Sequence, residues 1–136
     1  MAEVTRLVLV YNAEWNLRGG VEYAARLLKD RKDPCALCEI TYDGLRENKA
    51  WQACRVSFAI PVEGVYKNQL EATMDAAAEG QHPCVLAEVD DGTSSRFVRV
   101  VEAARLEECR ETEVPVECLF DALRDGLTAA GLPTVA

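Results

Sequence analysis

Apolar and polar residues follow strand-like and helix-like periods along the chain, and their order predicts an α/β protein. Residues 6–12 include a run of four apolar residues, which is typical of a central strand that is covered on both faces. Residues 21–30 carry apolar positions at helical spacing. Asp33-Pro34 ends that helix, because the residue before a proline avoids helical backbone angles. The first part of the chain therefore predicts a strand followed by a helix.

The middle of the chain predicts two more strands and two more helices. Residues 38–42 have strand-like side chains, and residues 46–55 predict a helix. Residues 56–62 alternate large apolar side chains with the small side chains of Ser57 and Ala59, so we expect a strand that reaches an edge or a bulge at Pro61. In the helix that follows, we expect Asn68 to cap the N-terminus and Met74 to lie in the core.

The C-terminal part of the chain predicts a hairpin and a long helix. Residues 84–89 and 96–101 are strand-like, and Asp91-Gly92 between them is typical of a hairpin turn. Residues 115–130 predict an amphipathic helix that begins at a proline and ends before a glycine. Its inward positions are Leu119, Phe120, Leu123 and Leu127. Repeats and linker-like stretches are absent from the sequence, so residues 1–136 are predicted to form a single domain.

Composition and charge exclude several functional classes. The net charge of −8 disfavours binding to nucleic acids and to anionic membranes. The N-terminal apolar run is too short for a signal peptide or a membrane span, so we expect a cytoplasmic protein. Cytoplasmic cysteines are mostly reduced, so the six cysteines are not interpreted as a disulfide framework. Cys54, Cys109 and Cys118 are expected to pack as small apolar residues.

Cys35 and Cys38 form the one local motif with chemistry of its own, a Cys-x-x-Cys. In one extended strand the two side chains would point to opposite faces, and the sulfur atoms could not meet. If Cys35 lies in a turn after Pro34, or if the pair opens a helical turn, the sulfur atoms can converge. The motif is compatible with two structural cysteines, a reversible disulfide, half of a metal site or a single reactive thiol.

The order of predicted elements matches that of the thioredoxin-like fold, and two local features support the resemblance. Residues 9–15, Leu-Val-Tyr-Asn-Ala-Glu-Trp, resemble the strand and the Ala-Glu-Trp run that lead into a thioredoxin active site. Pro83, before the first hairpin strand, is similar in position to the cis-proline of that family. The resemblance implies an α/β fold, with a central mixed sheet, a C-terminal antiparallel hairpin and helices on both faces.

The chain departs from that family where the redox cysteines would be. After Trp15 it has residues 16–19, Asn-Leu-Arg-Gly, in place of Cys-x-x-Cys. The stretch from Trp15 to Pro83 is longer than the family needs, and we expect residues 33–50 to be an insertion that carries the displaced motif. Residues 35–42, Cys-Ala-Leu-Cys-Glu-Ile-Thr-Tyr, also resemble a run in uncharacterised small bacterial proteins.

These observations predict a thiol–disulfide redox protein with Cys35 and Cys38 as catalytic residues, and no cofactor. A Gly-x-Ser-x-Gly nucleophile motif is absent from the sequence. A binding groove is expected at Tyr11, Asn12, Trp15, His82, Pro83 and Cys84. Protein thiols or another protein are the expected partners. The alternative is a non-catalytic module of the same fold that binds a partner through this groove.

Zinc binding is the remaining hypothesis for the cysteines. Cys35, Cys38, His82 and Cys84 would make an acceptable Cys₃His set of ligands. In a thioredoxin-like sheet, however, we expect the two pairs at opposite ends of the first strand, some 15–20 Å apart at about 3.3 Å per residue. We therefore predict that the protein carries no stoichiometric zinc.

Overall fold

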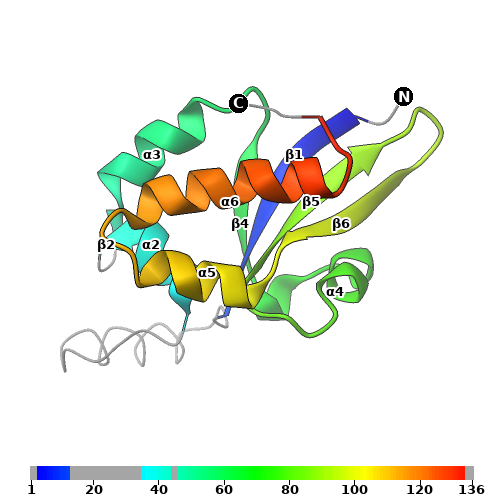
Figure 1. Ribbon diagram of the computed structural model, residues 1–136. Coiled ribbons are helices and arrows are strands. Elements are labelled where there is room, and N and C mark those ends of the chain that lie inside the picture. The colour runs from blue at the N-terminus through cyan, green and yellow to red at the C-terminus, as the bar shows by residue number, and fades with distance from the viewer. Residues whose placement is uncertain (1–2, 13–34, 44–45, 134–136) are drawn as a thin grey trace.

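A computed structural model of the chain describes residues 3–12, 35–43 and 46–133. It shows an α/β fold in which helices pack on a mixed four-stranded sheet (Figure 1). The described elements, in chain order, are β1 (Glu3–Tyr11), α2 (Ala36–Thr41), β2 (Tyr42–Asp43), β3 (Arg46–Glu47), α3 (Lys49–Val56), β4 (Val62–Tyr66), the 3₁₀ turn η1 (Lys67–Gln69), α4 (Ala72–Ala78), β5 (Cys84–Asp90), β6 (Ser95–Val101), α5 (Ala103–Arg110) and α6 (Pro115–Ala129). The helix predicted over residues 21–30 lies outside the described residues, as does Trp15.

The sheet has the strand order β4-β1-β5-β6. β1 pairs in parallel with β4 and antiparallel with β5, and β5 and β6 form an antiparallel pair. The central position predicted for the first strand is therefore confirmed, and so is the C-terminal hairpin. A separate short ladder joins β2 to β3 and pairs Tyr42 with Glu47.

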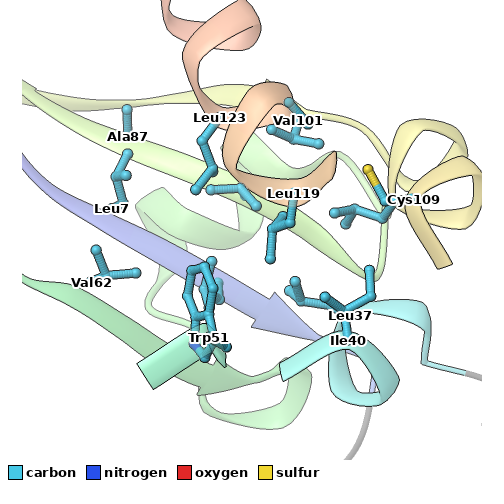
Figure 2. Packing of buried hydrophobic residues seen from close by; sticks show 14 of the residues in the cluster. Leu7, Leu37, Ile40, Trp51, Val62, Ala87, Val101, Cys109, Leu119 and Leu123 are labelled. Carbon is cyan, nitrogen blue, oxygen red and sulfur yellow. The ribbon is translucent and has the colours of Figure 1, made fainter. Parts of the chain in front are cut away.

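The two faces of the sheet carry cores of different size. On one face, which we call the α2 face, the larger core joins the sheet to α2, α3, α5 and α6 (Figure 2). On the other, the α4 face, a smaller core joins β1 and β5 to α4. Alternate residues of β1 point to opposite faces, so Leu7 and Leu9 belong to the first core and Val8 and Val10 to the second. The run of apolar residues in this strand reflects that double burial.

Helix α6 confirms the predicted C-terminal helix. Leu119, Leu123 and Leu127 are buried on the α2 face, and burial of each contributes about 1.5–3 kcal/mol. Phe120 is only partly buried. Gly126 allows the helix to lie close to the sheet, because a Cβ atom at this position would overlap the backbone carbonyl of Val100.

Two predicted strands are wrong. Residues 36–41 form helix α2, in which the Thr41 hydroxyl donates to the Leu37 carbonyl at 2.8 Å and Leu37 and Ile40 are buried. Residues 56–62 are also not a strand. Helix α3 continues to Val56, whose exposed fraction is 68%, and β4 begins only at Val62.

The helices differ from the prediction in one boundary, one cap and one additional helix. The helix predicted over residues 46–55 begins at Lys49, because the Asn48 side chain accepts from the backbone N–H of Trp51 at 2.9 Å. Asn68 lies in the 3₁₀ turn η1 and does not cap α4, although Met74 is in the core as predicted. Helix α5 was not predicted, because only Leu106 and Cys109 on it are buried and its apolar period is too weak.

Candidate thiol site and the adjoining tyrosine pocket

Cys35 and Cys38 lie at the start of helix α2, beside the carboxyl end of β1. The pair opens a helical turn, which is one of the two arrangements that allow the sulfur atoms to converge. The structure shows the pair in its dithiol form. The motif was expected near the opposite end of the first strand, and that placement is wrong because Cys35 contacts Asn12, the residue that follows β1.

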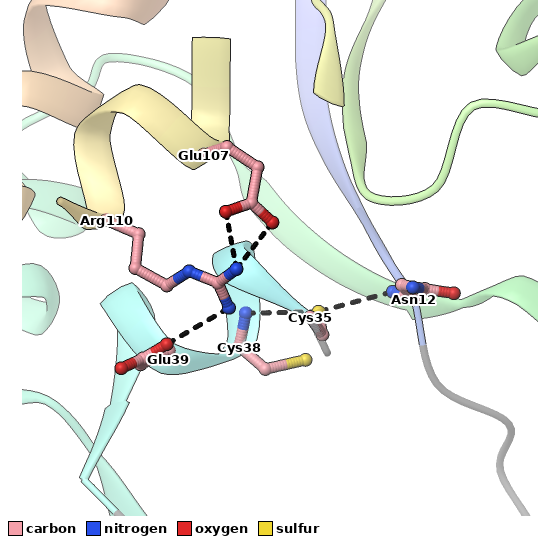
Figure 3. A network of polar contacts seen from close by, with 6 residues as sticks. All are labelled: Asn12, Cys35, Cys38, Glu39, Glu107 and Arg110. Atoms are coloured by element: carbon pink, nitrogen blue, oxygen red, sulfur yellow. Dashed lines mark hydrogen bonds and ion pairs between the residues drawn. The ribbon is translucent and has the colours of Figure 1, made fainter. Parts of the chain in front are cut away.

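The Cys35 sulfur accepts two backbone N–H groups (Figure 3). The N–H of Asn12 lies 3.3 Å from Cys35 Sγ, and the N–H of Cys38 lies 3.2 Å from it. The side chain of Lys67 donates to the Asn12 amide oxygen at 3.2 Å, which fixes the orientation of that residue. Backbone N–H groups directed at a sulfur can stabilise a thiolate, which is a much stronger acceptor than a neutral thiol.

Arg110 holds helix α5 against the motif helix. Its guanidinium donates to the carboxylate of Glu39 at 3.1 Å and to the carboxylate of Glu107 (Figure 3). The Arg110 side chain is only 8% exposed, whereas its partner Glu39 is 43% exposed, so the contact lies at the edge of the protein surface. Glu39 follows Cys38 directly, and the ion pair therefore anchors the motif to the rest of the α2 face.

A pocket of about 240 Å³ lies on the same face of the sheet. We call it the tyrosine pocket, because Tyr11, Tyr42 and Tyr66 line it together with Trp51. Leu9, Val62 and Gly64 from β1 and β4 complete its apolar part, and the ion pair of Glu47 and Arg55 supplies its charged part. The pocket thus combines aromatic walls with one positive and one negative group.

Tyr11 connects the pocket to the motif helix. Its ring contacts those of Tyr42 and Tyr66, with centroids 6.1 and 5.8 Å away. Its hydroxyl lies 3.5 Å from the Thr41 hydroxyl, and because Thr41 already donates to Leu37, Tyr11 is the donor of this bond. Burial raises the pKa of Tyr11 well above its ordinary value, so the side chain stays neutral.

The structure brings only part of the predicted groove together. Asn12 adjoins Cys35, but Tyr11 is largely buried and lines the tyrosine pocket instead. Pro83 is buried at the entrance of β5, and the predicted cis peptide bond between His82 and Pro83 is present. The Nε2 atom of His82 is buried and has no hydrogen-bond partner among the residues that the structure describes.

Cys84 lies on the α4 face, away from the thiol pair. It packs with Val8, Val10, Met74 and Leu86, and its exposed fraction is 0%. Burial raises the pKa of its thiol to about 11, partly offset by Arg99.

The placement argument used against zinc is wrong, because Cys84 pairs with Val10 near the same end of β1 as Cys35. The two cysteines instead lie on different faces of the sheet. Within residues 3–12, 35–43 and 46–133, no three His, Cys, Asp or Glu residues form a group that could hold a metal ion.

Cys109 and Cys118 form a disulfide, which corrects the expectation that both are merely packed thiols. It joins the end of α5 to the first turn of α6. Cys54 is half-buried, and burial raises the pKa of its thiol.

Sequence reasoning missed most of the tyrosine pocket. The ladder between β2 and β3 pairs Tyr42 with Glu47, which places their side chains on one side. Trp51 and Arg55 are four residues apart on α3 and share a helix face. This spacing was visible in the sequence, but the short strands that precede α3 were not.

Comparison with known proteins gives no further assignment. No protein-family model, no curated protein and no solved structure matches the chain. Among the helices that the structure describes, none has the length and apolar character needed to cross a lipid bilayer.

Proposed function

We propose that this protein is a thioredoxin-like thiol–disulfide redox protein that uses the displaced Cys35–Cys38 pair. The observation that carries the proposal is the environment of Cys35, whose sulfur accepts two backbone N–H groups within a Cys-x-x-Cys that opens a helix. A nucleophilic thiol requires such stabilisation of its ionised form. Cys35 is therefore the attacking residue and Cys38 the resolving residue.

Two features support the thioredoxin-like part of the proposal. The sheet order β4-β1-β5-β6 has one parallel and two antiparallel pairings, as expected for a βαβ unit followed by a hairpin. The Cys-x-x-Cys lies at the carboxyl end of β1, the strand end at which that family carries its redox site.

The proposed reaction moves two electrons. The Cys35 thiolate attacks one sulfur of a substrate disulfide, and the other substrate sulfur leaves as a thiolate that takes up a proton. Cys38, as a thiolate, then attacks the Cys35 sulfur of the mixed disulfide. The second substrate thiol is released, and the protein is left with a Cys35–Cys38 disulfide.

Burial limits which substrates can react. Exposed fractions are 1% for Cys35 and 6% for Cys38, so a substrate disulfide cannot reach the sulfur without displacing the residues that cover it. We therefore expect slow exchange with bulky protein disulfides, and faster exchange with small disulfides.

A redox titration tests the proposal. The protein is equilibrated in mixtures of reduced and oxidised dithiothreitol, quenched in acid, alkylated under denaturing conditions and mapped by mass spectrometry. We expect residues 35 and 38 to convert together in one two-electron step, and Cys35→Ser or Cys38→Ser to abolish that step. Peptide mapping separates this couple from the Cys109–Cys118 disulfide.

Cys84→Ser is the matched control, because Cys84 is equally buried but lies on the α4 face, and it should leave the couple unchanged. A pair that stays in the dithiol form at every dithiothreitol ratio would contradict the proposal.

A partner-binding function is the second candidate, supported by a groove of about 630 Å³ between α3 and the start of α6. Phe120 and Val114 lie along it, and Val114 is 52% exposed. Glu117 and Asp121 give the groove an acidic rim, which suits a partner with apolar and basic side chains. A helical Leu/Lys peptide that binds the wild type but not Val114→Asp, together with a redox-silent pair, would favour this function.

A further inference from the structure

The tyrosine pocket has the dimensions of a small-metabolite site. Its volume of about 240 Å³ corresponds to roughly eight water molecules at about 30 Å³ each. Sites for drug-sized ligands usually start at about 300 Å³. The pocket is therefore too small for a nucleotide or a folded peptide segment, and a compact ligand would fill it.

Arg55 and Glu47, the charged residues of the pocket, can each form further hydrogen bonds. Arg55 donates through Nε and Nη2 to the two carboxylate oxygens of Glu47, at 3.1 and 2.8 Å. With Nε and Nη2 engaged in this way, the Nη1 group of Arg55 has no hydrogen-bond partner in the described part of the chain. Each carboxylate oxygen of Glu47 likewise keeps lone-pair sites for a further donor.

The two charges select the class of ligand. A simple anion bound by Arg55 would be repelled by Glu47, and a simple cation bound by Glu47 would be repelled by Arg55. A zwitterion can place its carboxylate on Arg55 and its ammonium on Glu47, so that the charges around the ion pair stay balanced. The tyrosine rings add cation–π attraction for the ammonium group.

The walls are fixed before any ligand arrives. Trp51 has an exposed fraction of 0%, and Glu47 is positioned by its ladder partner Tyr42. Gly64 leaves room for the Tyr11 ring, because a Cβ atom at this position would overlap that ring. Such preorganisation reduces the entropy that a small ligand loses when it orders its site.

We propose that the tyrosine pocket binds a small α-amino acid in its zwitterionic form, with the carboxylate on Arg55 and the ammonium on Glu47. Leu9 and Val62 are almost fully buried, so the apolar part of the pocket leaves room for only a short side chain. The site is independent of the thiol chemistry proposed for Cys35 and Cys38, and it remains even if that pair is redox-silent.

Three matched probes test the proposal on the full chain. L-alanine carries both charges, propionate lacks the ammonium group, and ethylamine lacks the carboxylate. Binding is followed by NMR through the indole N–H signal of Trp51, which is assigned with a Trp15→Phe variant. We expect a saturable shift with L-alanine, and at least tenfold weaker binding of propionate and ethylamine.

Charge-removing variants give the decisive result. Glu47→Gln should weaken L-alanine binding at least tenfold and strengthen propionate binding, because the repelling carboxylate is gone. Arg55→Gln should reverse the preference toward ethylamine. A misfolded variant loses all three ligands, so a changed preference cannot be explained by unfolding. Arg105→Gln, which breaks the exposed Arg105–Glu108 pair on α5, is the control and should change nothing.

Three results would overturn the proposal. The first is the absence of any saturable shift at Trp51 with L-alanine. The second is equal affinity of the wild type for propionate and L-alanine, which would indicate a plain carboxylate site. The third is an unchanged ligand preference in both Glu47→Gln and Arg55→Gln.

Discussion

Cys35 and Cys84 are almost equally buried, with exposed fractions of 1% and 0%, yet their surroundings differ completely. On the α2 face, Cys35 accepts two backbone N–H groups. On the α4 face, Cys84 packs among apolar side chains, and burial raises its pKa to about 11. The comparison shows that two equally buried thiols can differ in the hydrogen-bond donors that surround the sulfur. Hydrogen-bond donors directed at the sulfur distinguish a candidate nucleophile from a packed side chain.

The largest expected effect concerns the stability of the two cores. Leu119→Ala on the α2 face should lower the free energy of unfolding by about 3–5 kcal/mol, and Met74→Ala on the α4 face by about 2–3 kcal/mol. The smaller loss follows from the smaller core around Met74 and from the adaptability of methionine packing. Equilibrium unfolding in urea measures both. A larger loss for Met74→Ala would show that the α4 face is the main source of stability.

A second prediction concerns the pH dependence of stability that Cys84 causes. The pKa of its thiol is about 11 in the folded protein, above the ordinary value of 9.0, so the unfolded chain loses this proton first. The contribution of the neutral Cys84 thiol to the free energy of unfolding is fully present below pH 9 and is lost as the pH rises toward 11. The pKa difference of about two units corresponds to about 2–3 kcal/mol of unfolding free energy.

Urea unfolding at pH 8, 9, 10 and 11 checks this prediction. The wild type should lose stability more steeply than Cys84→Ala, and the difference between the two curves isolates Cys84 from the tyrosines. Parallel curves would show that the α4 face does not hold this thiol in its neutral form.

The smallest effect compares two tyrosines within the tyrosine pocket. Tyr11→Phe removes the hydrogen bond to Thr41 and should cost about 0.5–1.5 kcal/mol of unfolding free energy. The long donor–acceptor distance of 3.5 Å places the value near the lower end. Tyr42→Phe is the control, because the Tyr42 hydroxyl has no hydrogen-bond partner among the described residues, and its cost should be close to zero. Thermal unfolding by circular dichroism resolves such differences when both variants are measured side by side.

Elements with a long, clear period could be predicted from the sequence. The central strand β1, the hairpin of β5 and β6 and the helix α6 each bury a regular set of apolar residues. Helix α2 could not be predicted, because it has only six residues and ends in the β-branched pair Ile40 and Thr41, which favours a strand. Its helical form depends on the Cys35 cap and on the burial of Leu37 and Ile40 against helices that come later in the chain.

The candidate site was predictable only as a motif. The cysteine spacing identified the thiol pair, but its place beside Asn12 depends on how the chain returns to β1. The tyrosine pocket takes residues from two strands of the sheet, from the short β2–β3 ladder and from α3. Parallel pairing of β1 with β4 places Tyr11 opposite Tyr66, and no local pattern encodes that pairing.

The disulfide between Cys109 and Cys118 closes a covalent ring around residues 110–117. Hydrolysis of a peptide bond inside that ring would leave the two fragments joined through the sulfur atoms. The ring contains Arg110, Glu111, Glu113 and Glu117, which are cleavage sites for proteases specific for arginine or glutamate. A molecule nicked there would migrate as one chain in electrophoresis without reductant and as two pieces with it. Because the nicked ends stay tethered, α6 would have no route to diffuse away from the sheet.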